Sequence, residues 1–167
     1  TYQIIKKNKG LLVSDEIQTG FGRVGEKFWG FQLHDVIPDI VTLGKPMGNG
    51  HPIGAVVCTK EIADKFNNGM EFFSSFGGNP VSCSIALSVL DELKKNKLQK
   101  NAEIIGNYIK SELKKVSKEF PIISNVRGKG LFLGFELTSN KLNPLPDQTS
   151  YLVNRMKEYG ILMSSDG

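Results

Sequence analysis

The sequence predicts an α/β protein in which a mainly parallel sheet is followed by a smaller α+β unit. The first half alternates short β-prone runs with glycine-rich loops and then helices, which is the order of an open α/β sheet. The second half places two strand-like runs next to each other before a helix. A polar break at 94–97 separates these patterns, so we expect a boundary near residues 95–100 and domains at 1–97 and 98–167.

The chain begins with signals for a helix and a strand. Residues 2–9 are typical of the end of a helix, with Gly10 as its C-terminal cap. The apolar run 10–14 indicates a buried parallel strand, and a long glycine-rich loop of the kind that is often functional follows at 16–27. The aromatic side chains within 28–31 are expected to pack in the core.

Two further strands and a helix are expected before the next loop. Residues 39–43 and 53–57 are β-prone and lie between turn-forming residues, so each is predicted to be a strand. Residues 60–66 are expected to form a helix with Thr59 as its N-cap. A second glycine-rich turn follows at 74–80.

The remaining elements are mostly helical, with a strand-rich insertion. Apolar side chains repeat at helical spacing from about Val81, and a second helix follows the polar break. Strands are expected at 122–126 and 131–137, because apolar and polar residues alternate there. A helix at about 148–158 and a strand at 161–163 complete the prediction.

Composition argues against several classes of protein. The chain has 167 residues and a net charge of +4, but it lacks a basic stripe with interleaved aromatic residues, so nucleic acid is not an expected partner. Cys58 and Cys83 form no disulfide framework, and the two histidines, His34 and His51, are too scattered for a metal site. Without a signal peptide or an apolar run that could cross a bilayer, we expect no membrane contact and a cytoplasmic location.

One lysine is placed where a ligand could meet it. Lys45 follows the strand at 39–43 and opens a loop of glycine, proline and asparagine. Pro46 should disfavour helical backbone at Lys45 and hold it extended at the end of the strand. Such a lysine can be a catalytic amine, although a solvated surface lysine is the ordinary alternative. The loop does not match the phosphate-binding P-loop, in which serine or threonine follows the lysine.

Asp15 ends the other strand of the predicted sheet. Ligands of open α/β sheets bind beyond the carboxyl ends of the strands, so Asp15 and Lys45 are expected to face one crevice. An amine and a carboxylate in one crevice suit pyridoxal phosphate, because the amine can form a Schiff base with its aldehyde and the carboxylate can pair with its ring nitrogen. An aspartate in such a position more commonly forms a turn than binds a ligand.

Three blocks of sequence extend this interpretation to a family. They are Asp15-Glu16-Ile17-Gln18-Thr19-Gly20-Phe21-Gly22-Arg23, Pro38-Asp39-Ile40-Val41-Thr42-Leu43-Gly44-Lys45 and Ser75-Phe76-Gly77-Gly78-Asn79-Pro80. Together, in this order and at this spacing, they resemble the class-III pyridoxal-phosphate aminotransferases. The resemblance covers the whole chain and implies a fragment of a fold-type I transferase, with part of the parallel-sheet large domain and part of the small α+β C-terminal domain.

The resemblance implies a role for each of five residues. Lys45 would hold pyridoxal phosphate as a Schiff base and then move the α-proton of the substrate, while Asp15 would keep the ring nitrogen protonated. Gln18 would bind near the phenolic oxygen of the cofactor. Ser75, where the family usually has threonine, and the backbone around Phe76 would bind the cofactor phosphate of the neighbouring subunit, in a homodimer with shared active sites.

Three residues that are close in sequence to these five have a different expected role or two possible roles. Ser74 competes with Ser75 as the phosphate ligand. Glu16 is expected to be structural, because strand alternation turns its side chain away from that of Asp15. His51 flanks the lysine loop, where packing within the loop is favoured over a contact at the edge of the cofactor.

The expected function is a class-III aminotransferase that moves an amino group between an amine or amino acid and an oxo acid. The stretches 28–32, 44–52 and 161–167 most resemble the alanine–glyoxylate aminotransferase-like branch, which includes phospho-lyases. A phospho-lyase acting on a phosphorylated amine, such as phosphoethanolamine or phosphohydroxylysine, is therefore the alternative. A non-enzymatic cofactor-binding module is a third possibility, and the fragment alone is expected to be inactive.

Overall fold

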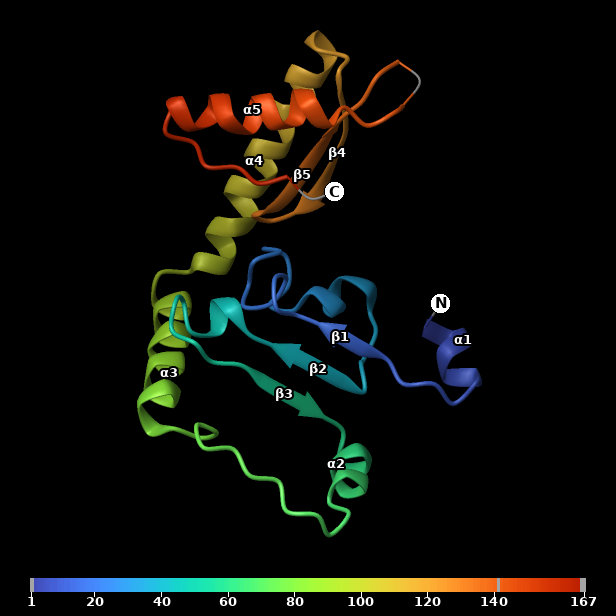
Figure 1. Cartoon of the computed structure of the whole chain (residues 1–167), viewed down its shortest axis with the longest axis vertical. Coiled ribbons are helices and arrows are strands. Elements are labelled where there is room, and N and C mark those ends of the chain that lie inside the picture. The colour runs from blue at the N-terminus through green and yellow to red at the C-terminus, as the bar shows by residue number, and fades with distance from the viewer. Residues whose placement is uncertain (1, 141, 166–167) are drawn as a thin grey trace. The chain divides into compact units, whose positions relative to one another are not determined.

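Residues 2–140 and 142–165 are described by a computed structural model, in which the mixed α/β chain forms two units (Figure 1). The first unit comprises the chain up to Gly106 together with Lys129–Phe132, and the second comprises Asn107–Gly128 and the chain from Leu133 onward. The unit boundary thus follows Gly106, later than the boundary expected near residues 95–100. The domains at 1–97 and 98–167 stay a prediction.

The sheet of the first unit has the order β1–β2–β3, with β1 at Val13–Asp15, β2 at Ile40–Leu43 and β3 at Ala55–Cys58. Strands β1 and β2 are parallel, as predicted, whereas β2 and β3 are antiparallel. The connection between β2 and β3 holds one turn of 3₁₀ helix, η2 (Lys45–Met47), and lacks the crossover helix that usually joins parallel strands. Within the described residues the sheet is therefore mixed rather than mainly parallel.

Strand β1 is shorter and more exposed than the predicted strand at 10–14. Leu11 is 58% exposed and Val13 is 53% exposed in this chain on its own, so the expected burial is wrong here. The residues before β1 are held by Asp39, whose Oδ2 accepts a hydrogen bond from the Leu12 N–H at 2.8 Å. The Leu12 N–H and then the Lys6 ammonium keep the pKa of Asp39 below its ordinary value.

The first helix, α1 (Tyr2–Lys7), ends differently from the prediction. The Gly10 N–H donates to the Ile5 carbonyl at 2.9 Å, and the Lys9 N–H donates to the Lys6 carbonyl at 3.0 Å. In this closure the left-handed residue is Lys9, with φ of 56°. Lys9, and not the expected Gly10, therefore reverses the chain.

The other helices of the first unit begin close to their predicted positions. Helix α2 (Lys60–Phe66) follows Thr59, which caps it through its backbone carbonyl rather than its side chain. Helix α3 (Pro80–Lys95) follows Asn79, whose Oδ1 accepts from the N–H groups of Val81 and Ser82. Helix α4 (Leu98–Glu119) comes after the polar break and belongs to the first unit only up to Gly106.

The second unit pairs helices with a small sheet. Strands β4 (Ile123–Lys129) and β5 (Phe132–Leu137) are neighbours, as predicted, and α5 (Pro146–Glu158) starts slightly earlier than expected. The strand predicted at 161–163 is not formed among the described residues. The Ile161 N–H instead donates to the Met156 carbonyl at 3.0 Å, which closes the C-terminus of α5.

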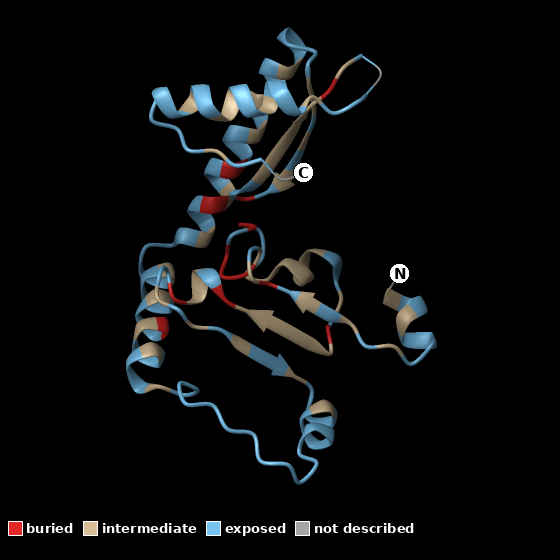
Figure 2. Cartoon of the chain, viewed as in Figure 1, coloured by how far each residue is buried: buried red, intermediate tan, exposed pale blue. Residues whose placement is uncertain are grey.

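The best-buried part of the first unit is a loop rather than the sheet. Figure 2 shows much of the buried ribbon, in red, in the loops that follow β1 and β2 and in the first half of α4. Phe21 is 7% exposed, and its ring meets those of Phe28 and Trp29 with centroids 5.8 and 5.2 Å away. The predicted packing role of the aromatic side chains within 28–31 is confirmed for Phe28 and Trp29. None of the described helices is long and apolar enough to cross a membrane.

Three glycines allow the loop after β1, helix α4 and the turn after β4 to approach one another. A Cβ atom at Gly25 would lie 2.6 Å from the Glu103 Cα, and one at Gly106 would overlap the Gly130 carbonyl. Gly130 also has φ of 54°, a conformation that favours glycine. The Leu131 N–H also donates to the Arg23 carbonyl at 2.9 Å, which joins the turn after β4 to the loop after β1.

Replacing Gly106 with alanine is therefore expected to destabilise the protein. The added methyl group would overlap backbone atoms, which cannot move aside as a flexible side chain can, so the free energy of unfolding should fall by about 2 kcal/mol or more. Gly134→Ala is the control, because no atom lies within 4 Å of a Cβ at that position. Urea unfolding of both variants measures the difference, and equal stabilities would contradict the close backbone contact between Gly106 and Gly130.

Candidate functional site

The structure brings Asp15 and Lys45 to the same edge of the sheet. Strands β1 and β2 are parallel neighbours, and Asp15 lies beside Thr42 in their register. Lys45 follows two residues after the end of β2 at Leu43. Because the carboxyl ends of parallel strands share one edge, an acid and an amine lie at adjacent strand ends, as the sequence predicts.

The Asp15 carboxylate is fixed by two donors on one of its oxygens. Its Oδ1 accepts a hydrogen bond from the Ile17 N–H at 3.0 Å and another from the Thr42 hydroxyl at 3.3 Å. The first bond forms the turn that an aspartate commonly makes, so the ordinary structural role is present too. Among the described residues Oδ2 has no partner, and the side chain is exposed. One oxygen therefore orients the carboxylate, and the other is free for a ligand.

The backbone at Lys45 is not extended, contrary to the expectation from Pro46. Lys45 begins η2 (Lys45–Met47) and has φ of 32°, which is unusual for a long side chain. The turn is closed by the Met47 N–H, which donates to the Gly44 carbonyl at 2.9 Å, and by the Gly48 N–H, which donates to the Lys45 carbonyl at 3.3 Å. These bonds overcome the local preference and leave strain of a kind that is common at functional sites.

The Lys45 amine is available to a ligand. The residue is exposed, and no hydrogen bond or ion pair reaches its Nζ from any residue that the structure describes. Some other surface lysines are engaged by a nearby acid, as Lys60 is by Asp64 at 2.6 Å. The lysine at the end of the strand thus has a fixed backbone and an uncommitted amine.

Glu16 organises the loop that follows Asp15. It is 1% exposed, and its carboxylate accepts four hydrogen bonds. Oε1 accepts from the Ser14 hydroxyl at 3.0 Å and the Phe31 N–H at 2.8 Å, while Oε2 accepts from the Thr19 hydroxyl at 2.9 Å and the Gly30 N–H at 2.7 Å. The expected structural role is confirmed. What sequence reasoning missed is that this one carboxylate joins both ends of the loop.

Gln18 lies on the loop that Glu16 holds. Its side chain is exposed and has no partner among the described residues. The structure therefore places it near the end of β1 without defining a contact, and its role near a cofactor stays a prediction.

Ser75 and Phe76 lie in an exposed segment between α2 and α3, visible as the long light-green coil in Figure 1. Phe76 is 84% exposed, and the Ser75 hydroxyl has no partner among the described residues. The Gly77 N–H donates to the Ser74 hydroxyl at 3.1 Å, so it is not free to join the anion nest expected there. Within the described residues no hydrogen bond links this turn directly to Asp15 or Lys45.

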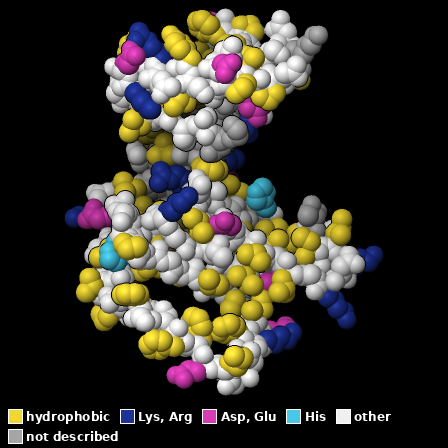
Figure 3. All heavy atoms as spheres, in the orientation of Figure 1, with side chains coloured by type: hydrophobic (Ala, Val, Ile, Leu, Met, Phe, Trp, Pro, Cys, Tyr) yellow, Lys and Arg dark blue, Asp and Glu magenta, His cyan; other side chains and the backbone are white. Residues whose placement is uncertain are grey.

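The same segment is unusually apolar for an exposed coil. Met70, Phe72 and Phe73 are 81%, 74% and 78% exposed in this chain on its own. Figure 3 shows hydrophobic side chains, in yellow, on much of the visible surface. Phe72 has one aromatic neighbour, Phe66, with ring centroids 5.7 Å apart.

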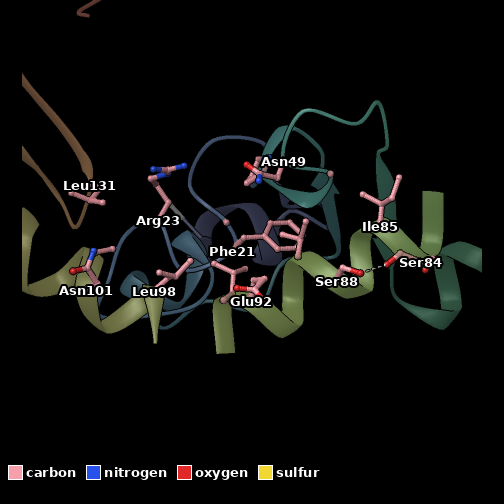
Figure 4. A pocket seen from close by; sticks show the side chains of 17 residues that line it. Phe21, Arg23, Asn49, Ser84, Ile85, Ser88, Glu92, Leu98, Asn101 and Leu131 are labelled. Carbon is pink, nitrogen blue, oxygen red and sulfur yellow. Dashed lines mark hydrogen bonds between the residues drawn. The ribbon is translucent and has the colours of Figure 1, made fainter. Parts of the chain in front are cut away.

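A hollow of about 590 Å³ lies behind the lysine loop (Figure 4). The loops around Phe21 and Asn49, helix α3 and the start of α4 line it. Neither Asp15 nor Lys45 is among its lining residues, so it is separate from the two strand ends. Its lining is mostly apolar, with Arg23 and Glu92 as charged side chains.

Comparisons with known proteins match the chain over nearly its full length. The family model described as "Aminotransferase class-III" matches residues 2–167. A Drosophila melanogaster protein, "Alanine–glyoxylate aminotransferase 2-like", is 46% identical over 170 residues, covering 99% of this chain and 34% of that protein. The Homo sapiens protein "Alanine–glyoxylate aminotransferase 2, mitochondrial" is 42% identical over 165 residues, covering 97% of this chain and 32% of the relative.

A solved structure is similar over the same span. A phospholyase from Arthrobacter in complex with phosphoethanolamine has a TM-score of 0.94 and 42% identity to this chain. The match covers 99% of this chain and 40% of the phospholyase chain. The chain thus spans about a third of the length of the curated relatives that it matches. The name of the human relative places that protein in mitochondria, and the cytoplasmic location expected for this one stays a prediction.

The Glu16 anchor generates a stability test. In Glu16→Gln one oxygen becomes an NH₂ group, and on either side of the side chain that group would face a backbone N–H, from Gly30 or from Phe31. Two donors cannot pair, so the free energy of unfolding should fall by about 1–3 kcal/mol. The control is Glu26→Gln, since Glu26 forms an exposed ion pair with Lys129 and the loss of that pair should reduce stability much less. A Glu16 variant as stable as the Glu26 variant would contradict the anchoring role.

Proposed function

The chain belongs to the class-III aminotransferase family, and on this premise we propose that the whole protein transfers an amino group with pyridoxal phosphate bound at Lys45. The amino group would pass between an amine or amino acid and an oxo acid. The observation that carries the proposal is the parallel register of β1 and β2, which puts Asp15 beside Thr42 and near the Lys45 turn.

The available groups fit this cofactor chemically. Pyridoxal phosphate presents an aldehyde, a ring nitrogen and a phosphate. The uncommitted Lys45 amine suits the aldehyde, and the free oxygen of Asp15 suits a protonated ring nitrogen. When bound, the cofactor supplies an electron sink that stabilises negative charge on the α-carbon of the substrate.

The residues of this chain would divide the remaining work. Lys45 would hold the cofactor covalently, and its free amine would take a proton from the α-carbon and return one. Asp15 favours the protonated ring nitrogen through its charge. The Thr42 hydroxyl and the Ile17 N–H aim the Asp15 carboxylate, which makes Thr42 a positioning residue that sequence reasoning did not identify.

Three further assignments belong to the proposal. Gln18 would bind near the phenolic oxygen of the cofactor. Ser75, with the backbone around Phe76, binds the cofactor phosphate of the neighbouring subunit in a homodimer with shared sites, which the exposure of this turn supports. Residues 1–97 and 98–167 belong to the large and small domains of the whole protein.

A second reaction is favoured by one specific likeness. The similarity to the Arthrobacter phospholyase supports elimination of phosphate and ammonia from a phosphorylated amine. Both reactions use the same proton transfer at Lys45 and the same Asp15 partner. They would differ in the next step, which is either the return of a proton by Lys45 or the loss of a neighbouring phosphate from the substrate.

The first test identifies the lysine that binds the cofactor. Borohydride reduction of the full-length protein loaded with pyridoxal phosphate, followed by peptide mapping, should place the label on Lys45 and on no other lysine. Lys45→Ala should remove the label and lower the rate of amino transfer by at least about a thousandfold, since both covalent binding and proton transfer are lost. Lys60→Ala, which removes an exposed lysine of α2, should change neither. A label on a different lysine would refute the assignment.

The second test separates the two reactions. The full-length enzyme is incubated with alanine and glyoxylate, and in parallel with phosphoethanolamine and with phosphohydroxylysine. Amino transfer without release of phosphate is the expected result. Release of phosphate and ammonia in equal amounts, without net amino transfer, would replace aminotransferase by phospho-lyase. Lys45→Ala should be inactive in either assay.

A further inference from the structure

His51 connects the lysine loop to helix α3. Its Nε2 lies 2.8 Å from the Ser82 hydroxyl, and both residues are half-buried. His51 belongs to the connection between β2 and β3, whereas Ser82 lies in the first turn of α3. This is a bond between two segments that are 31 residues apart in the sequence. The expectation that His51 packs at its own loop is therefore incomplete, because its side chain reaches another element.

On one side, the bond leads back to Lys45. The His51 N–H donates to the Gly48 carbonyl at 3.1 Å, and the Gly48 N–H donates to the Lys45 carbonyl at 3.3 Å. Gly48 is buried and has no room for a side chain, because a Cβ there would overlap the His51 carbonyl. Two successive hydrogen bonds thus close the turn from Lys45 to His51, with the unusual φ of 32° at Lys45 inside it.

On the other side, the bond leads to the turn before α3. The Ser82 N–H donates to Asn79 Oδ1 at 3.2 Å, and the Asn79 N–H donates to the Phe76 carbonyl at 3.2 Å. Hydrogen bonds and short stretches of backbone therefore run without a break from Lys45 through Gly48, His51, Ser82 and Asn79 to Phe76. The side-chain bond between His51 and Ser82 is the link that joins the two turns.

We propose that His51 is a positioning residue for Lys45, which acts by fastening the strained lysine turn to the first turn of α3. The bond fixes the Lys45 backbone relative to the turn that holds Ser75 and Phe76. Both turns carry groups assigned to the cofactor, so the inference rests on the proposed function and extends it. His51 needs no contact with cofactor or substrate in this role.

Hydrogen–deuterium exchange of the full-length, cofactor-free protein tests the link without any catalytic readout. His51→Ala should speed exchange roughly fivefold to tenfold at both 45–51 and 76–82, as expected when a hydrogen bond that holds both turns is lost. Ser82→Ala should do the same, and the double variant should add little. Ser88→Ala is the matched control, because the Ser88 hydroxyl bonds only within α3, to the Ser84 carbonyl.

Binding of pyridoxal phosphate then tests the positioning role. His51→Ala and Ser82→Ala should each raise the dissociation constant roughly fivefold to tenfold, while His51→Gln and Ser82→Thr, which keep a polar group in reach, should restore most of the affinity. If His51→Ala fails to fold, Ser82→Ala and the conservative variants carry the test.

The outcomes separate the two proposals. Unchanged exchange at 76–82 in His51→Ala or Ser82→Ala, or fully additive effects in the double variant, would overturn the link. Coupled exchange with unchanged cofactor affinity would overturn the positioning role but leave the proposed function standing. An unmodified protein that binds no pyridoxal phosphate would instead refute the proposed function, and the exchange result would still decide the link.

Discussion

The buried Glu16 carboxylate is the interaction on which the candidate site depends. A carboxylate that is 1% exposed is stable only if its lone pairs are satisfied, and here four donors supply those bonds. Two donors are backbone N–H groups from residues 30 and 31, so the glycine-rich loop is held at both ends by one side chain. Asp15 comes directly before this anchor, and Gln18 lies on the loop that the anchor closes. The loop therefore does not need regular secondary structure in order to keep its shape.

A second constraint acts on the neighbouring strand end. Lys45 has a left-handed φ that a long side chain rarely adopts, and hydrogen bonds within residues 44–51 preserve it. The amine is left without a partner among the described residues, while the backbone beneath it is fixed. Such an arrangement fits a residue that must form a covalent bond in one orientation. The parallel register with β1 supplies the acidic partner at the adjacent strand end.

The sequence predicted the parts of the fold that local patterns determine. Helices α2, α3 and α5, the parallel pair β1 and β2, and the structural role of Glu16 all follow from capping residues, apolar spacing and strand alternation. Contacts between segments were harder to foresee. The antiparallel direction of β3 depends on the short connection after β2, and the φ of Lys45 depends on a turn that overrides the preference set by Pro46. The bond between His51 and Ser82 joins distant positions, and no local pattern signals it. The predicted strand at 161–163 has no partner strand among the described residues, because bonding there closes α5 instead.

The central claim is that Asp15 and Lys45 act on one molecule of pyridoxal phosphate. The most direct test is a crystal structure of the full-length protein grown with this cofactor. The account predicts continuous electron density from the Lys45 Nζ to the aldehyde carbon, with the Asp15 carboxylate within hydrogen-bonding distance of the ring nitrogen. Density that joins the cofactor to another lysine, or a ring nitrogen that faces a different group while Asp15 points to solvent, would contradict it.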